Sequence, residues 1–290
     1  MTGVGVAGWD YPDWSGIVYP RRAARGFDRL AWIARFVDVV EINATFYRPV
    51  NPKVAETWIR RVAAHPGFRF TAKAHRSWTH EICENPEAAV GPTLEGLAPL
   101  REAGLLGALL IQFPQSFHFT QESVTRLHRL LDAVTGWPVV VEVRHVSWDD
   151  DHAAAWMRAR GAGWCVVDQP RAKGATAPPR PRVTAGIAYL RLHGRNEDAW
   201  FAENAGRDAC YDYLYPMHAL RPLAESARAM GAQAKALYVI ANNHFRGQAL
   251  ANALQLKHLI QGTEPDAPEE LLAVYPDLKD VVSAKSHRLF

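Results

Sequence analysis

The stretch Pro138-Val139-Val140-Val141-Glu142-Val143-Arg144-His145 decides the fold. Its first half is β-branched and continuously apolar, which is typical of a strand that is covered on both faces in a parallel sheet. Glu142 and Arg144 follow two residues apart, so their side chains point to the same face of the strand. The stretch therefore predicts a strand that is buried for most of its length and ends at a polar site.

Seven further segments have the same organisation, and apolar residues at helical spacing separate most of them. The expected strands cover 4–8, 37–43, 68–75, 108–113, 138–145, 164–168, 187–193 and 237–242. The expected helices cover 27–36, 52–64, 93–102, 122–134, 149–160, 211–230 and 248–260, with interruptions of the helix at 211–230 near Pro216 and Pro222. This alternation predicts an α/β protein, a single (β/α)8 TIM-like barrel, with an open doubly wound sheet as the alternative.

Residues 170–186 break the alternation, because they are rich in Pro, Ala and basic residues and have no helical period. We expect the helix between strands six and seven to be missing or reduced to a turn. No flexible linker divides the sequence, so residues 1–290 are expected to form one domain. Its barrel core would span about 4–260, followed by a Pro-rich C-terminal extension at 261–290 with an amphipathic piece around 269–274.

Polar residues stand near the C-terminal ends of nearly all the expected strands. This distribution favours the barrel, because an open sheet gathers such residues at one switch point, whereas barrels use all strand ends for binding and catalysis. The candidates for ligand binding are Glu41, Asn43, Lys73, Gln112, Arg144, Arg191, Arg195, Asn242 and Asn243, and the candidates for catalysis are Glu142 and His193. Strand alternation predicts that Glu41, Lys73, Glu142, Arg144, Arg191 and His193 share one pocket at the barrel mouth.

The two catalytic candidates have different expected roles. Arg144 should keep Glu142 ionised at neutral pH, which suits a base or a ligand anchor. His193 would then be the proton donor, since the ordinary pKa of histidine is near 6.5.

A structural role is the competing interpretation of these charges, because buried charges are costly unless they are paired. Glu41 and Lys73 on neighbouring strands can form an ion pair, and Glu142, Arg144 and Arg191 can form a closed network. The size of the whole set nevertheless favours a functional site over a purely structural one.

The loops after the last two strands indicate an anion site. Barrels often bind phosphate with these loops. Here they read His193-Gly194-Arg195-Asn196 and Asn242-Asn243-His244-Phe245-Arg246-Gly247, and each contains a glycine that allows close backbone approach and an arginine that can clamp an oxyanion. The loops therefore predict that sulfate or phosphate can bind near Arg191, Arg195 and the turn 242–247.

Composition narrows the class of protein. The chain has 290 residues, a formal net charge of +3 and a sequence pI near 8.8, so nucleic acid is a possible partner that is not favoured. Three cysteines without metal-ligand spacing indicate a reducing compartment. With no signal peptide and no apolar run of membrane-spanning length, we expect a cytoplasmic protein without a membrane partner. The oligomeric state stays open.

The motifs resemble those of the YecE-like family, also called domain of unknown function number seventy-two. The resemblance rests on Val40–Tyr47, Phe70–Lys73 with Thr79-His80, Gln112–Pro114, Val141–His145 with Trp148, Tyr189–Arg195 and Asn242–His244. It extends in order from Gly8 to about Ile260 and implies a TIM-like barrel of one domain. The resemblance brings no established reaction or cofactor. The first loop departs from the family's usual Tyr-Trp step, because Pro12 and Asp13 separate Tyr11 from Trp14.

Several functions remain open from the sequence. The first is an enzyme or binder of a small anionic compound, possibly phosphorylated, with its cofactor unspecified. The alternative is a divalent-metal phosphoesterase or nuclease, with ligands from Glu41, His75, Glu142, Asp168, His193 and His244, although the intervening arginines and lysine would repel a cation. Glycoside hydrolysis by Glu41 and Glu142 is disfavoured, because cationic neighbours oppose the protonated state that a general acid needs. A non-catalytic protein partner fits poorly with an internal polar site.

Overall fold

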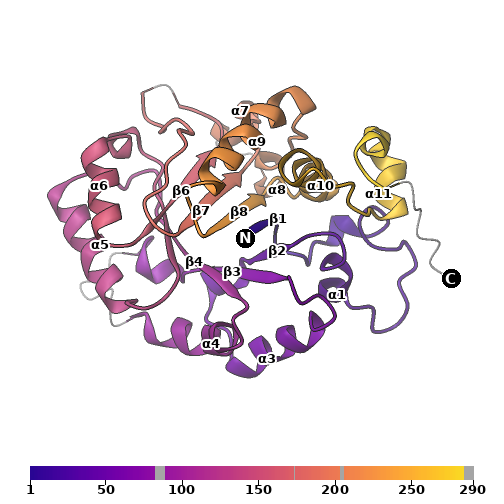
Figure 1. The fold of residues 1–290 in the computed structure, drawn as a ribbon, viewed down its shortest axis with the longest axis horizontal. Coiled ribbons are helices and arrows are strands. Elements are labelled where there is room, and N and C mark those ends of the chain that lie inside the picture. Colours follow the sequence, from indigo (N-terminus) through magenta and orange to yellow (C-terminus); the bar gives the residue numbers. More distant parts are fainter. Residues whose placement is uncertain (82–88, 173, 203–205, 284–290) are drawn as a thin grey trace.

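Eight parallel strands close into a barrel in the order β1 to β8 in the computed structural model, which describes residues 1–81, 89–172, 174–202 and 206–283 (Figure 1). The strands are β1 Thr2–Ala7, β2 Val39–Ile42, β3 Arg69–Lys73, β4 Leu106–Gln112, β5 Val139–Glu142, β6 Gly163–Asp168, β7 Ile187–Leu192 and β8 Ala236–Ala241. β8 pairs with β1 from Thr2 opposite Leu237 to Val6 opposite Ala241, which closes the sheet. The predicted barrel is therefore confirmed, and the open sheet is excluded.

Helices surround the barrel as an outer layer (Figure 1). They are α1 Arg29–Ile33, α2 Ala44–Tyr47, α3 Pro52–Arg61, α4 Gly91–Glu102, α5 Gln121–Ala133, α6 Asp151–Ala159, α7 Glu197–Phe201, α8 Arg207–Cys210, α9 Met217–Gly231, α10 Gln248–Gln261 and α11 Glu269–Val274. Side-chain caps begin several of them: Thr120 accepts from the Ser123 amide at α5, and Asp150 accepts from the His152 and Ala153 amides at α6.

The prediction that the helix between strands six and seven is missing or reduced is confirmed, because the described part of 169–186 contains no helix. The expected interruption at Pro222 is wrong, because α9 begins at Met217, after Pro216, and continues through Pro222. A proline there removes one helical hydrogen bond, and the buried apolar face of α9 compensates for that loss. The short helices α2, α7 and α8 were not expected, since none is long enough to show a period.

Apolar side chains and two tyrosines fill the barrel interior below the polar residues. A Cβ atom at Gly5 would lie 1.7 Å from the carbonyl oxygen of Val39, and one at Gly107 would lie 2.3 Å from the Tyr238 hydroxyl. Only glycine fits at these two positions. The inward-facing apolar layer comprises Ala7, Val39, Ala108, Leu110, Val140, Cys165, Val167, Tyr189, Tyr238 and Ile240. Above this layer, toward the C-terminal ends of the strands, the inward positions become polar.

The first loop and the loop after β8 are joined at the C-terminal side of the barrel. Trp14, in the 3-10 turn η1 Pro12–Trp14, is fully buried and donates from Nε1 to the His244 carbonyl at 2.7 Å. The Asp13 carboxylate accepts from the Arg246 amide at 2.6 Å. Arg246 has a positive φ of 50°, which a non-glycine residue adopts only when its surroundings hold it there. This turn is therefore fixed by the first loop.

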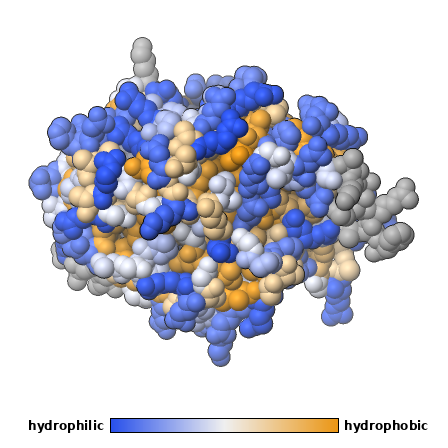
Figure 2. Space-filling model, viewed as in Figure 1, coloured by the Kyte–Doolittle hydropathy of each residue, from blue (hydrophilic) through white to orange (hydrophobic). Residues whose placement is uncertain are grey.

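The surface is mainly hydrophilic on the face that Figure 2 shows, with small apolar areas between the charged side chains. Among the described residues, none of the helices combines the length and the apolar character that a membrane crossing requires. In the tail, Leu271 of α11 and Leu278 of η6 Pro276–Asp280 are buried in the main hydrophobic core. The extension thus packs onto the barrel.

Candidate functional site

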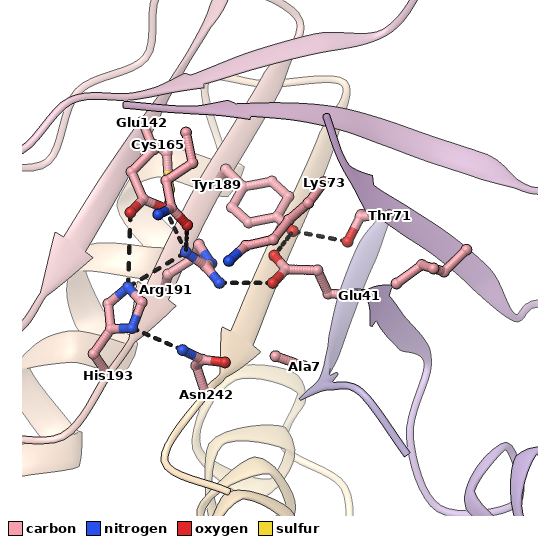
Figure 3. Close-up of polar contacts among 12 residues, drawn as sticks. Ala7, Glu41, Thr71, Lys73, Glu142, Cys165, Tyr189, Arg191, His193 and Asn242 are labelled. Carbon is pink, nitrogen blue, oxygen red and sulfur yellow. Dashed lines mark hydrogen bonds and ion pairs between the residues drawn. The ribbon is translucent and has the colours of Figure 1, made fainter. Parts of the chain in front are cut away.

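Charged side chains from four strands converge at the C-terminal end of the barrel interior (Figure 3). Strand alternation explains their meeting, because each occupies the inward position of its strand, as do the residues of the apolar layer beneath. We call Glu41, Glu142 and Arg191 the buried ion cluster, since none of the three side chains is exposed to solvent. The sequence prediction that these residues lie together is confirmed.

Arg191 of β7 connects the two carboxylates of the buried ion cluster. Its Nη2 donates to Glu41 Oε1 at 2.7 Å, and its Nη1 donates to Glu142 Oε2 at 2.5 Å. Gln112 at the end of β4 accepts from the same Nη1 at 3.2 Å. A guanidinium that bridges two carboxylates pairs both of them in a site without solvent.

Arg144 follows β5 and binds the outer side of Glu142. Its Nε and Nη2 both donate to Glu142 Oε1, at 2.8 and 2.7 Å. Burial raises the pKa of Glu142, but Arg191 and Arg144 outweigh that effect and hold this pKa well below its usual range. Glu142 is thus a carboxylate at neutral pH, as predicted, and its low basicity suits an anchor better than a base.

His193 extends the cluster beyond β7. Its Nδ1 lies 2.8 Å from the Asn242 amide nitrogen, and its Nε2 lies 3.4 Å from Arg191 Nη1 and 3.8 Å from Glu142 Oε1. Burial and the neighbouring Arg191 lower the pKa of His193 to about 3. The expected role as proton donor rested on an ordinary pKa, which this environment removes. His193 is therefore a neutral hydrogen-bonding group at neutral pH.

Lys73 lies at the end of β3, beside the buried ion cluster, and its amine points toward the barrel axis (Figure 3). Its Nζ lies 5.2 Å from the centre of the Phe46 ring, and it forms no hydrogen bond or ion pair with any described residue. Burial and Arg191 lower the pKa of Lys73 to about 8, although Glu41 and Glu142 act in the opposite direction. The alternative of an ion pair between Glu41 and Lys73 is not realised, because Glu41 binds Arg191 instead.

Sequence reasoning missed two hydroxyl groups below the charges. The Tyr189 hydroxyl donates to Glu41 Oε2 at 2.9 Å and lies 2.8 Å from the Thr71 hydroxyl. Tyr189 stands two residues before Arg191, and Thr71 two before Lys73, so strand alternation places both on the inward face. The sequence did not indicate that Glu41 accepts a hydrogen bond from Tyr189 in addition to the one from Arg191.

Arg195 and Asn243 lie apart from the buried ion cluster. Arg195 donates from Nη2 and Nε to Asp168, at 2.8 and 2.9 Å, and Asp168 also accepts from the Tyr215 hydroxyl at 2.6 Å. Asn243 donates to Asn252 Oδ1 at 2.8 Å. Asp168 and Asn243 occupy the outward positions of their strands, toward the helices, so alternation separates them from the inward residues.

Asn43 and His75 also lie outside the hydrogen-bonded network. Asn43 follows β2, and its buried Oδ1 has no hydrogen-bond partner among the described residues. His75 begins the 3-10 turn η2 Arg76–Trp78 and accepts from the Ser77 amide at 3.2 Å through Nδ1. His80, at the end of this turn region, is exposed, and its ring packs against Phe46 at 5.0 Å. His75 is therefore replaced by His80 as the histidine near Lys73.

Aromatic rings line the opposite side of the mouth. The His244 ring stacks on Tyr11 at 4.4 Å and contacts Tyr211 at 4.9 Å, and Tyr211 meets Trp200 edge-on at 5.9 Å. Trp200 in turn lies 5.9 Å from His193. The mouth thus has cationic groups on the β3–β5 side and flat rings on the β7–β8 side.

The geometry gives no support for the metal or glycosidase alternatives. Arg191 lies between Glu41 and Glu142 and binds both, so a cation in that position would be repelled. Within the described ranges, no three His, Cys, Asp or Glu side chains are arranged to hold a metal ion. The lowered pKa of Glu142 also opposes its use as the acid of a glycosidase.

Comparison with known proteins agrees with the fold and adds no activity. A model of the family DUF72, described as a protein of unknown function, matches residues 3–272. UPF0759 protein YunF from Bacillus subtilis (strain 168) is 27% identical over 273 residues, which cover 90% of this chain and 95% of that protein. A DUF72 family crystal structure from Thermotoga maritima MSB8 has a TM-score of 0.79 and 32% identity, covering 90% of this chain and 99% of that one. Another, from Enterococcus faecalis V583, has a TM-score of 0.78 and 26% identity, covering 93% and 99%.

Proposed function

We propose that this chain, which belongs to the DUF72 family of proteins of unknown function, binds a small anionic compound at the mouth of its barrel and acts on it. The observation that carries the proposal is a charge imbalance. The buried ion cluster with Arg144 contains two carboxylates and two arginines, so these four charges cancel. Protonated Lys73 adds one positive charge that no described carboxylate contacts.

The mouth cations, Lys73 and Arg144, are the groups that can reach a ligand. The Arg144 side chain is 15% exposed, whereas Arg191 is fully enclosed. Arg144 is also held in place by Glu142 through Nε and Nη2, which leaves Nη1 without a partner among the described residues. A fixed guanidinium with a free donor beside an unpaired ammonium suits a carboxylate or a phosphate. Glu142 would then position Arg144 and would not contact the ligand directly.

This position differs from the one that the sequence favoured, near Arg195 and the turn 242–247. Arg195 is already paired with Asp168 through two donors. We therefore place the anion on the β3–β5 side. The aromatic side of the mouth would contact the rest of the ligand through flat faces such as Trp200 and Tyr211. We also propose that the protein is cytoplasmic. Cys165 and Cys210 are free thiols, which a reducing compartment favours.

Thermal unfolding in the presence of inorganic phosphate and sulfate tests the position. A ligand at about 100 times its Kd stabilises the folded protein by about 2.7 kcal/mol, which is readily measured. We expect Arg144→Met to lose this stabilisation and Arg195→Met to keep it. The two variants are matched, because each removes an arginine from a carboxylate that retains another donor, Arg191 for Glu142 and Tyr215 for Asp168. The opposite pattern would move the anion to the loops after β7 and β8, and no stabilisation of the wild type would remove the proposal.

A further inference from the structure

We propose that Lys73 is a nucleophile that forms an imine with a small carbonyl compound bearing a carboxylate or phosphate group. This inference rests on the proposed function, since the mouth cations would hold the acidic group of the compound. It adds a covalent step and a substrate class, an aldehyde or ketone. Three observations support the inference. The carboxylates around Lys73 are occupied, its amine can lose a proton, and a neutral histidine contacts the Phe46 ring that Lys73 also contacts.

All four carboxylate oxygens of the buried ion cluster accept hydrogen bonds from groups other than Lys73. Glu41 Oε1 accepts from Arg191 at 2.7 Å, and Glu41 Oε2 accepts from Tyr189 at 2.9 Å. Glu142 Oε1 accepts from Arg144 at 2.7 Å, and Glu142 Oε2 accepts from Arg191 at 2.5 Å. Lys73 therefore has no carboxylate bound to its ammonium that would hold the proton.

The surroundings favour the neutral amine. Burial, Arg191 and Arg144 all lower the pKa of Lys73, and they outweigh the attraction of Glu41 and Glu142, so this pKa is about 8. An ordinary lysine has a pKa near 10.4, so at pH 8 the neutral fraction of Lys73 exceeds that of an ordinary lysine by about 100-fold. A lowered pKa of this kind is how lysines become nucleophiles toward carbonyl groups. The Lys73 side chain as a whole is only partly buried.

Under this proposal, His80 would transfer protons through solvent, because its ring and Lys73 both contact Phe46. Its ring packs at a right angle on Phe46, whose ring centre is 5.2 Å from Lys73 Nζ. Its Nδ1 lies 2.8 Å from the Thr79 hydroxyl, which fixes the ring. Burial, Arg144 and Lys73 lower the pKa of His80, so this imidazole is neutral and can accept a proton at neutral pH.

The chemical step balances without an oxidant or a metal. The lone pair of Lys73 Nζ attacks the carbonyl carbon, the C–N bond forms, and the π electrons of the C=O bond move to oxygen, which takes a proton. The resulting carbinolamine loses its hydroxyl and the second amine proton as water, with His80 relaying protons, and the C=N bond forms. One amine and one carbonyl compound thus give one imine and one water. Arg144 would hold the acidic group during both steps.

Reductive trapping tests the inference on the full-length protein at pH 8. The probes are pyruvate, glyoxylate and glyceraldehyde 3-phosphate, each with sodium cyanoborohydride, which reduces an imine to a stable secondary amine. Peptide mass mapping then locates the modified lysine. We expect Lys73 to be modified at least about tenfold faster than exposed Lys53, as its larger neutral fraction requires. Acetone, which has no acidic group, should modify Lys73 much more slowly.

The variant Lys73→Arg keeps the positive charge and removes the nucleophile. We expect it to lose the modification, and Lys73→Gln serves as a second variant if arginine does not fit. Lys53→Arg is the control and should be modified at Lys73 as the wild type is. The imine alone would be overturned if Lys73 and the exposed lysines were modified to the same extent. It would also be overturned if Lys73 were not modified in a protein that phosphate stabilises. Absence of both modification and phosphate stabilisation would overturn the anion site as well.

Discussion

Two arginines bind the same carboxylate, and their surroundings are opposite. Arg191 is fully enclosed and donates to Glu41 and Glu142, so its charge is paired inside the barrel. Arg144 is partly exposed and shares Glu142 with Arg191. We therefore expect the buried ion cluster to contribute to stability and the mouth cations, Arg144 and Lys73, to contribute to binding.

The largest expected effect comes from removing the enclosed arginine. Arg191→Met leaves Glu41 and Glu142 buried without their shared partner, which we expect to destabilise the fold by about 3–5 kcal/mol. Arg144→Met should cost only about 1–2 kcal/mol, because Glu142 keeps its bond to Arg191. Chemical denaturation of both variants measures the difference. An equal loss in the free energy of unfolding for both variants would show that Arg191 and Arg144 contribute equally to stability.

The next effect is a pH dependence from His193. The pKa of His193 is lowered to about 3 in the folded protein by burial and Arg191, whereas the unfolded chain protonates near pH 6.5. Between these values the unfolded state binds the extra proton, so stability falls as pH decreases. Glu142 and Arg144 also face this ring.

We expect His193→Gln to reduce the loss of stability between pH 6.5 and 4.5 by about 2 kcal/mol. Denaturant titrations of the wild type and the variant at each pH provide the measurement. His80 and His145 also have lowered pKa values, so a smaller slope should remain in the variant. An unchanged slope would mean that His193 is protonated as easily in the folded protein as in the unfolded one.

A smaller effect of the same sign is expected at Lys73. Its folded pKa of about 8 lies below that of an unfolded lysine, so stability falls as the pH decreases from about 10.4 to about 8, and the loss persists at lower pH because the folded state then holds an ammonium that lacks a partner. Lys73→Met should therefore stabilise the protein at pH 7 by about 1–2 kcal/mol, after allowance for partial exposure, and this gain should disappear near pH 10.5. Such a gain is typical of residues kept for function. Destabilisation at pH 7 would instead identify Lys73 as a structural partner.

The sequence predicted the barrel well, because the apolar runs of the strands and the helical spacing between them are local properties of the sequence. Val139 to Val141 has the continuous apolar character of a covered strand. The absence of a helical period in 170–186 correctly indicated that the described part of this segment contains no helix. Strand alternation also placed Glu41, Glu142, Arg191 and His193 together, as the structure shows.

Pairing within the site could not be predicted in the same way. Alternation gives the face of a strand but not the order of partners across the barrel. A pair between Lys73 and Glu41 was therefore left open, whereas Glu41 binds Arg191. The pKa of His193 depends on burial by distant segments, which no local pattern reveals. His80 lies outside the strands, and only the fold of the turn after β3 brings it near Phe46.

The pKa of the Lys73 amine tests the central claim, that the mouth holds one positive charge in need of an anion. Labelling lysine with carbon-13 at Cε lets NMR follow this pKa, with the signal assigned by its absence in Lys73→Met. We predict a pKa of about 8 in the free protein and a higher value with phosphate bound, because an adjacent anion stabilises the ammonium. An ordinary pKa near 10.4 that phosphate leaves unchanged would contradict the account.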